Sequence, residues 1–196
     1  MKEFFKRNKK VLIFSLVIFL VCAIGSAIFA YSSVGENYGA ISNALWHKNV
    51  TGNQTSNISF KLNTIDLFLH NLLADYVLIA GGLLFSVFSV LITIFNGVII
   101  GIPFGTDLTY SLVTILPHGI LEYSATVFAL ACAFNITKLE IKMIKNRSFK
   151  STLIENKRAL KDILIMCMIV FILLLIAAII ECNLIDPIAT WYYGLN

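Results

Sequence analysis

The chain has 196 residues, of which 58% are hydrophobic and only 13% are charged, and its formal net charge is +4 at pH 7. Soluble domains carry about 25% charged residues, so this composition excludes a soluble globular protein and a soluble active site. We predict an all-α, multi-pass protein of the cell membrane. Residues 1–196 are enough for a single small membrane domain, and no segment is polar enough to form a second one.

Basic residues occur in two blocks, and this asymmetry predicts the topology. Five of the 15 Lys and Arg residues lie within residues 1–10, and eight lie between Lys138 and Lys161. Short cytoplasmic segments of membrane proteins are enriched in Lys and Arg, so we expect both blocks, and the N-terminus, to face the cytoplasm. Residues 32–65 hold only two lysines and are expected to form an external loop.

The first predicted span covers residues 11–31, a run of apolar residues long enough to cross a hydrocarbon core of about 30 Å. A cleaved signal peptide is the alternative, because Ala23, Gly25 and Ala27 are small residues of the kind that cleavage sites use. The apolar run exceeds the roughly 7 to 15 residues of a signal peptide, which favours a retained membrane anchor.

The predicted external loop contains three Asn-x-Ser/Thr triplets, which are acceptor motifs for N-glycosylation. The candidate acceptors are Asn49, Asn53 and Asn57. A polar loop rich in Asn, Ser and Thr also generates such triplets by chance, so chance triplets remain the alternative.

The next apolar stretch is predicted to form two spans, residues 66–85 and 86–104, joined by a tight cytoplasmic turn close to Ser86. A single long helix kinked at Gly81 and Gly82 is the alternative. Two spans are favoured because the chain must cross an odd number of times between the external loop and the second basic block.

Two further spans are predicted at residues 116–136 and 163–180, which place the C-terminus outside. Residues 137–162 connect them as a basic cytoplasmic segment. This segment either lies on anionic lipid headgroups as an amphipathic helix or serves only to determine topology. Nucleic-acid binding is not expected, because the charge lies next to the membrane and no recognition fold accompanies it.

Ionisable and amide side chains recur within the predicted spans. His118 and Glu122 are the clearest case, because a spacing of four residues places them on one helix face. A charged group at membrane depth costs roughly 2.5 to 3.5 kcal/mol on insertion scales, so it is expected to be paired or functional. With a helical rise of about 1.5 Å per residue, polar residues of three spans reach similar depths in the outer half of the membrane. The predicted polar seam consists of His70, Asn71, Asp75, Asn96, His118 and Glu122.

Glycines lie near these polar residues, and small residues let membrane helices approach one another closely. Gly97 and Gly101 form a GxxxG pattern, and Gly81, Gly82 and Gly119 are further candidates for helix packing. We expect these glycines to serve packing inside the bundle, with the formation of an oligomer as the alternative.

Several of these motifs together resemble a known family. They are His70-Asn71-Leu72, Gly81-Gly82, Phe95-Asn96-Gly97 with Gly101, and Pro117-His118-Gly119-Ile120-Leu121-Glu122. In order and spacing they are similar to the stage II sporulation protein M family. The resemblance implies an integral membrane protein with five spans. It also implies a scaffold role, since in spore-forming bacteria the family member helps to assemble a complex with two cell-wall-degrading proteins during engulfment.

Three classes of function are compatible with these features. The first is a scaffold that organises a membrane or cell-envelope protein complex, with lipids and other membrane or envelope proteins as partners. The second is a transport component or permease, because imidazole and carboxylate groups together can relay protons. The third is an intramembrane metal hydrolase that uses His70, Asp75, His118 and Glu122 as ligands and base, since two His and a carboxylate can hold zinc. The chain lacks a His-Glu-x-x-His motif, so we expect no enzyme, no metal and no cofactor.

Overall fold

The structure, a computed structural model, describes residues 2–52 and 64–193, with side chains described for residues 2–33, 64–184, 187 and 188. Within these residues every regular element is a helix, and five helices are long and apolar enough to cross a membrane. The prediction of an all-α bundle with five spans is therefore confirmed.

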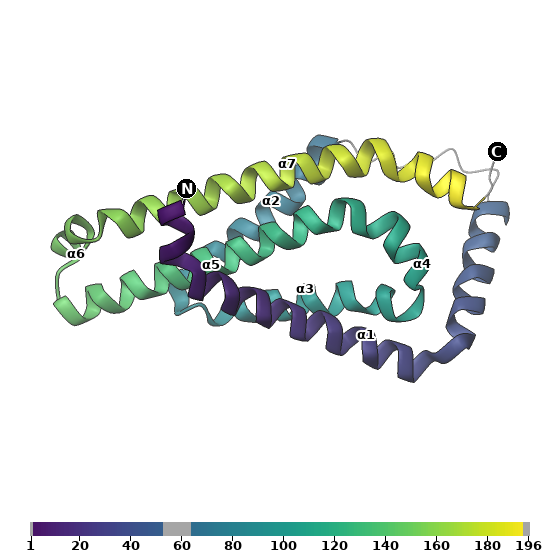
Figure 1. The fold of residues 1–196 in the computed structure, drawn as a ribbon, viewed down its shortest axis with the longest axis horizontal. Coiled ribbons are helices and arrows are strands. Elements are labelled where there is room, and N and C mark those ends of the chain that lie inside the picture. Colours follow the sequence, from purple (N-terminus) through teal and green to yellow (C-terminus); the bar gives the residue numbers. More distant parts are fainter. Residues whose placement is uncertain (1, 53–63, 194–196) are drawn as a thin grey trace.

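The first helix, α1 (Lys2–Gly52), is much longer than the predicted span, and Figure 1 shows that it turns sharply in its second half. Its membrane-spanning part is Lys2–Ser33. The chain continues as helix over residues 32–52, where the sequence predicted a loop, and no proline interrupts this stretch. The three candidate glycosylation acceptors lie outside the described side chains; they are Asn49, Asn53 and Asn57.

The stretch predicted as two spans does fold as two helices. Helix α2 (Thr64–Ala80) leads into a short 3-10 helix, η1 (Gly81–Leu84), and α3 (Val87–Thr106) follows. Phe85 and Ser86 adopt left-handed conformations with φ of 52° and 58°, which breaks the helix between the two spans. The alternative of one long kinked helix is excluded.

This turn is held by α5, the central helix (Leu116–Asn146). Thr137 Oγ1 donates a hydrogen bond of 2.7 Å to the carbonyl of Gly82 and lies 2.6 Å from Ser86 Oγ. A Cβ atom at Gly82 would lie 2.6 Å from the carbonyl oxygen of Ala133, so only glycine allows η1 to approach α5 this closely. The break between α2 and α3 therefore depends on tertiary contacts as well as on local sequence.

Two short elements, α4 (Leu108–Tyr110) and the π-helical η2 (Ser111–Ile115), connect α3 to α5. After α5, the short α6 (Phe149–Glu155) leads into the last helix, α7 (Lys157–Tyr193). The predicted basic segment is thus largely helical. Figure 1 shows α4 and α6 at opposite ends of the bundle, which we call the α4 end and the α6 end.

Helix α5 forms the core of the bundle. In Figure 1 it lies between α7 on one side and α1 with α3 on the other. Alanines fill its buried face, and Leu130 and Cys132 are also fully buried. Small side chains permit the close approach of Met166 and Val170 from α7, which are buried as well.

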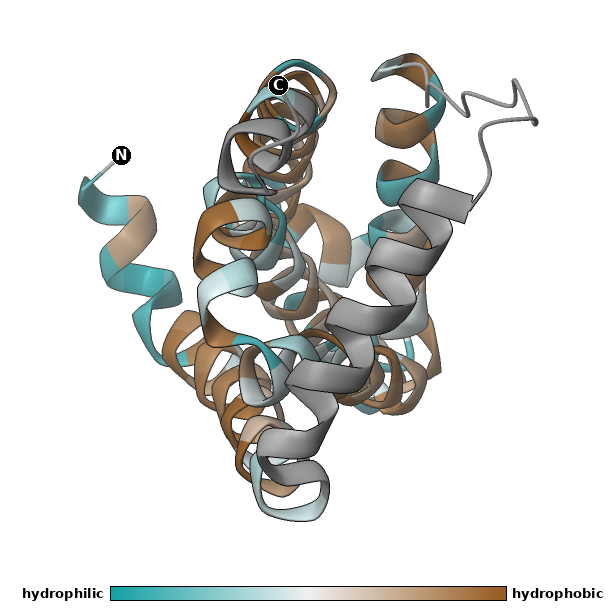
Figure 2. Ribbon diagram, turned by 90° about the vertical axis from the view of Figure 1, so that its right-hand side faces the viewer, coloured by the Kyte–Doolittle hydropathy of each residue, from teal (hydrophilic) through white to brown (hydrophobic). Residues whose placement is uncertain are grey.

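Large apolar side chains face outward around this core, as expected for contact with lipid. Examples on α1 are Phe14, Val21, Ile28 and Phe29, all of which are exposed. Figure 2 shows apolar colouring along most of the helices, whereas the first turns of α1 are hydrophilic. The distribution agrees with a membrane-embedded protein.

The glycines of the GxxxG pattern lie between α1 and α3. A Cβ atom at Gly97 would lie 2.9 Å from Cys22 Cβ, and one at Gly101 would overlap the carbonyl oxygen of Ala23 and the hydroxyl of Ser26. Both glycines therefore serve contacts inside the bundle. Two other packing candidates lie close to residues of their own segment. A Cβ at Gly81 would approach Ser89, and a Cβ at Gly119 would approach Tyr123.

Candidate functional site

Two pairs of polar side chains join α2 to α5 inside the bundle. Asn71 Nδ2 donates a hydrogen bond of 2.5 Å to Glu122 Oε1. One helical turn further along, Thr126 Oγ1 donates a hydrogen bond of 3.1 Å to Asp75 Oδ1, in a buried environment. Three of the predicted seam residues are thus in interhelical hydrogen bonds, and Thr126 is a partner that the sequence did not single out.

The fourth seam residue, His118, faces a third helix. Its Nε2 atom lies 4.0 Å from Oε2 of Glu181 on α7, and the two side chains are 13% and 28% exposed. Glu181 was not predicted, because the last span was expected to end at residue 180. The signal in the sequence was the absence of a helix-breaking residue directly after residue 180, which allows α7 to continue.

The structure does not bring His70 and Asn96 into this group. His70 is exposed on α2, because a residue next to Asn71 points about 100° away around the helix. Asn96 is half-buried on α3. Within the described part of the chain, neither side chain makes a hydrogen bond. The sequence predicted a similar depth for all six residues, but in the structure helix rotation separates two of them from the others.

We call the group of His118, Glu122, Glu181 and Asn71 the α4-end cluster. Pro117, which has no N–H group, stands at the start of α5 directly after the π-helical turn, and His118 follows it. One ligand-type atom from each of His118, Glu122 and Glu181 can be chosen so that all three lie within 4.8 Å of one another. The cluster can hold protons or a cation between α5 and α7.

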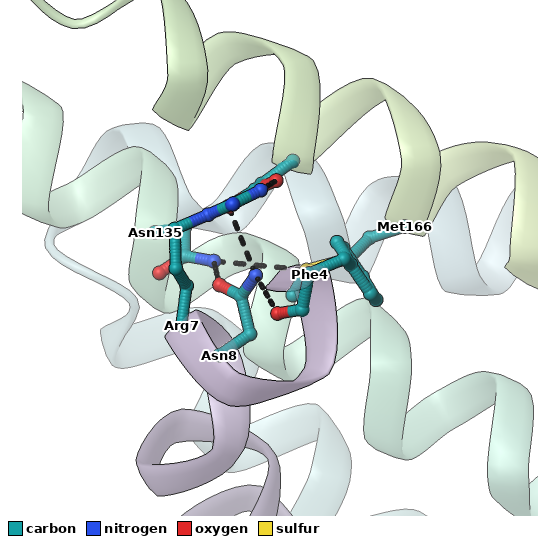
Figure 3. Close-up of polar contacts among 6 residues, drawn as sticks. Phe4, Arg7, Asn8, Asn135 and Met166 are labelled. Carbon is teal, nitrogen blue, oxygen red and sulfur yellow. Dashed lines mark hydrogen bonds and ion pairs between the residues drawn. The ribbon is translucent and has the colours of Figure 1, made fainter. Parts of the chain in front are cut away.

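A second polar network lies at the α6 end, and Figure 3 shows three of its side chains meeting there. Arg7 donates two hydrogen bonds to the Asp162 carboxylate, of 2.9 Å from Nε and 2.6 Å from Nη2. Asn8 Nδ2 donates to Asp162 Oδ2 at 3.0 Å, and Asn135 Nδ2 donates to Asn8 Oδ1 at 2.9 Å. The network connects α1, α5 and α7.

The sequence did not predict this second network, because Arg7 was interpreted only as a determinant of topology and Asp162 only as part of the basic segment. A usable signal was present in the sequence, because Asp162 directly precedes the apolar run of the last span. In the structure its side chain is only 6% exposed. An acidic residue at that position needs a cation or donors nearby.

Comparison with known proteins identifies the family. Residues 15–184 match the sequence model of stage II sporulation protein M. The chain belongs to this family. The match extends beyond the motifs that carried the resemblance and includes all five spans at least in part.

A similar protein occurs in the archaeon Methanocaldococcus jannaschii, where it is an uncharacterized protein. It is 32% identical to this chain over 146 residues, which cover 71% of this chain and 79% of the archaeal protein. No solved structure matches the chain. The stage II sporulation protein M family is not a known enzyme family.

Proposed function

We propose that this protein is a scaffold of the cell membrane that organises a membrane or cell-envelope protein complex. The observation that carries the proposal is the use of polar side chains at both ends of the bundle for bonds between helices. Asn71 bonds to Glu122 near the α4 end, and Arg7 bonds to Asp162 at the α6 end. Hydrogen bonds between membrane helices contribute about 0.6 kcal/mol each on average. Several of them together hold the helices in one fixed arrangement, which we call the frame.

The frame would present its basic side chains to partners on the cytoplasmic side. Exposed cations gather near α6, and we call them the α6-end basic surface: Lys145, Lys150, Lys157 and Arg158. The positive-inside rule supports a cytoplasmic α6 end and N-terminus, with the α4 end external. Partners with acidic segments near the membrane would fit this surface, as would anionic lipids.

Affinity purification in mild detergent from native membranes, with partner identification by mass spectrometry, tests the proposal. The expected result is a reproducible partner in roughly stoichiometric amount. A triple variant with Lys145, Lys150 and Lys157 changed to Gln should lose a partner that binds the basic surface, whereas the matched triple change to Arg should keep it. Recovery of the wild-type protein alone, after crosslinking in cells, would overturn the scaffold proposal.

A transport component with a proton or solute path through the bundle is the second candidate. It is favoured by Asp75 Oδ2 and His118 Nδ1, which are buried and have no hydrogen-bond partner within the described residues. Flux measured in vesicles that contain only this protein would support transport. No flux, together with a stable partner complex, would exclude it.

The proposed role is not enzymatic. The intramembrane hydrolase hypothesis required His70, Asp75, His118 and Glu122 to come together as zinc ligands and base. In the structure His70 is exposed and Asp75 is bonded to Thr126, so this ligand set is not assembled.

A further inference from the structure

We propose that His118, Glu122 and Glu181 form a binding site for a divalent transition-metal ion of the Zn²⁺ type, which fastens α7 to α5 at the α4 end. This set differs from the ligand set of the hydrolase hypothesis, because Glu181 takes the place of His70 and Asp75. The site goes beyond the scaffold function and does not depend on it.

The chemistry of the three side chains suits such an ion. Zn²⁺ accepts imidazole nitrogen and carboxylate oxygen as ligands, at distances of about 2.0 to 2.2 Å. Ligands in a tetrahedron at these distances stand roughly 3.3 to 3.6 Å apart. The three donor atoms already lie within 4.8 Å of one another. Small rotations of the flexible Glu122 and Glu181 side chains would close the remaining gap.

The hydrogen bonding of His118 points to a ligand independently of the cluster's composition. Its ring lies near the backbone carbonyl of Thr114, an acceptor for one imidazole N–H, although Nδ1 makes no full hydrogen bond among the described residues. Its Nε2 atom is 4.0 Å from Glu181 Oε2, which is too long for a hydrogen bond. With the Thr114 carbonyl on one side of the ring, Nε2 faces the Glu181 carboxylate without bonding to it, so this nitrogen is open to a further partner such as an ion.

Glu122 is supported in the way that metal-binding carboxylates usually are. Asn71 Nδ2 donates to its Oε1 atom at 2.5 Å, and this bond orients the carboxylate from a neighbouring helix. Outer hydrogen bonds of this kind position ligands and raise metal affinity. The other oxygen, Oε2, is left for an ion.

The charges also favour a cation. Two carboxylates and an imidazole are gathered where the His118 and Glu181 side chains are only 13% and 28% exposed. Like charges repel strongly in such a setting, where water screens them little. A divalent ion would balance both carboxylates. Because two ligands belong to α5 and one to α7, binding would hold the two helices together at this end.

Metal titration of the purified full-length protein in detergent tests this site. The protein is stripped with EDTA and titrated with ZnCl₂ by calorimetry, with MgCl₂ in parallel. We expect one Zn²⁺ per chain and a rise of about 5 °C or more in the midpoint of thermal unfolding when Zn²⁺ is hundredfold above its Kd. Mg²⁺ should bind much more weakly, because it prefers ligand sets made of oxygen only.

Matched variants separate this site from binding elsewhere. His118→Ala and Glu181→Gln should each weaken Zn²⁺ binding at least about tenfold. The controls are His70→Ala, an exposed histidine on α2, and Glu140→Gln, a half-buried glutamate near the other end of α5. Both controls should bind as the wild type does. No saturable binding by the wild-type protein, or equal affinity in all four variants, would overturn the proposal.

Cobalt spectroscopy keeps the test valid if a variant folds poorly. His118→Cys replaces the nitrogen ligand by sulfur, so Co²⁺ bound to this variant should show a sulfur-to-cobalt charge-transfer band above that of the wild-type protein. Wild-type protein is the reference because it has four cysteines of its own. An identical Co²⁺ spectrum in a folded His118→Cys variant would exclude His118 as a ligand.

Discussion

Asn71 donates its side-chain hydrogen bond to Glu122, which stands 51 residues later in the chain, and the Asp75–Thr126 pair has the same separation. A constant separation over one helical turn means that α2 and α5 run parallel at this contact. The Ser86–Thr137 contact repeats the separation at the far end of α2 and η1. One register therefore governs the contact from the α4-end cluster to the turn after η1.

The Asn71–Glu122 bond should contribute measurably to stability. In a double-mutant cycle with Asn71→Ala and Glu122→Ala, we expect a coupling free energy of about 0.6 to 1.7 kcal/mol, the average and maximum found for such bonds in membrane helices. Unfolding in mixed micelles measures it. Asn96→Ala is the control, since Asn96 makes no side-chain hydrogen bond within the described residues. A coupling free energy near zero between Asn71 and Glu122 would contradict their contact.

Loss of the Asp162 carboxylate should release the N-terminal turns of α1 from α7. Asp162→Ala removes three accepted hydrogen bonds and is expected to destabilise the protein by about 1 to 2 kcal/mol. Loss of a fully buried ion pair would cost more, but the Arg7 side chain is 41% exposed. Thermal unfolding in detergent checks the value. Lys6→Ala, an exposed neighbour, should change the midpoint little; an equal effect would refute a specific network.

Close packing of α1 on α3 should make Gly101 intolerant of any side chain. Gly101→Ala places a methyl group against the Ala23 carbonyl and Ser26, and overpacking of this kind costs about 1 to 3 kcal/mol. Gly25→Ala is the matched control, because nothing lies within 4 Å of the position that its new Cβ would occupy and alanine favours helix. Unfolding free energies of both variants provide the comparison. Equal tolerance at the two glycines would contradict the contact.

Cys132 and Cys167 should form a disulfide under mild oxidation. Their Sγ atoms are 3.8 Å apart across α5 and α7, and a bonded pair needs about 2.05 Å, which small rotations supply. After copper-phenanthroline treatment and denaturation, maleimide labelling should show two thiols fewer than in untreated protein. Cys132→Ser should abolish this loss. Unchanged labelling of the wild-type protein would show that α5 and α7 meet in another register.

The α4-end cluster shows where prediction from sequence stops. Asn71, Asp75, His118 and Glu122 could be selected because polar residues in an apolar run are conspicuous and helical rise gives their depth. His70 met the same criteria, yet it is exposed, because the rotation of α2 about its axis depends on its neighbours. Glu181 was not selected, because it lies just beyond the apolar run, although α7 continues through it.

Hydropathy along the chain was sufficient to predict the all-α membrane class, because insertion into a bilayer responds to the hydropathy of consecutive residues. The number of spans was predicted only when the two basic blocks were considered as well. The sequence also indicated a chain reversal near Ser86. The meeting of particular polar side chains, such as Arg7 with Asp162 and His118 with Glu181, emerged only from the arrangement of the helices in space. Lipid contact sets the depth and length of each span, whereas the rotation of each helix about its own axis follows from its packing against the others.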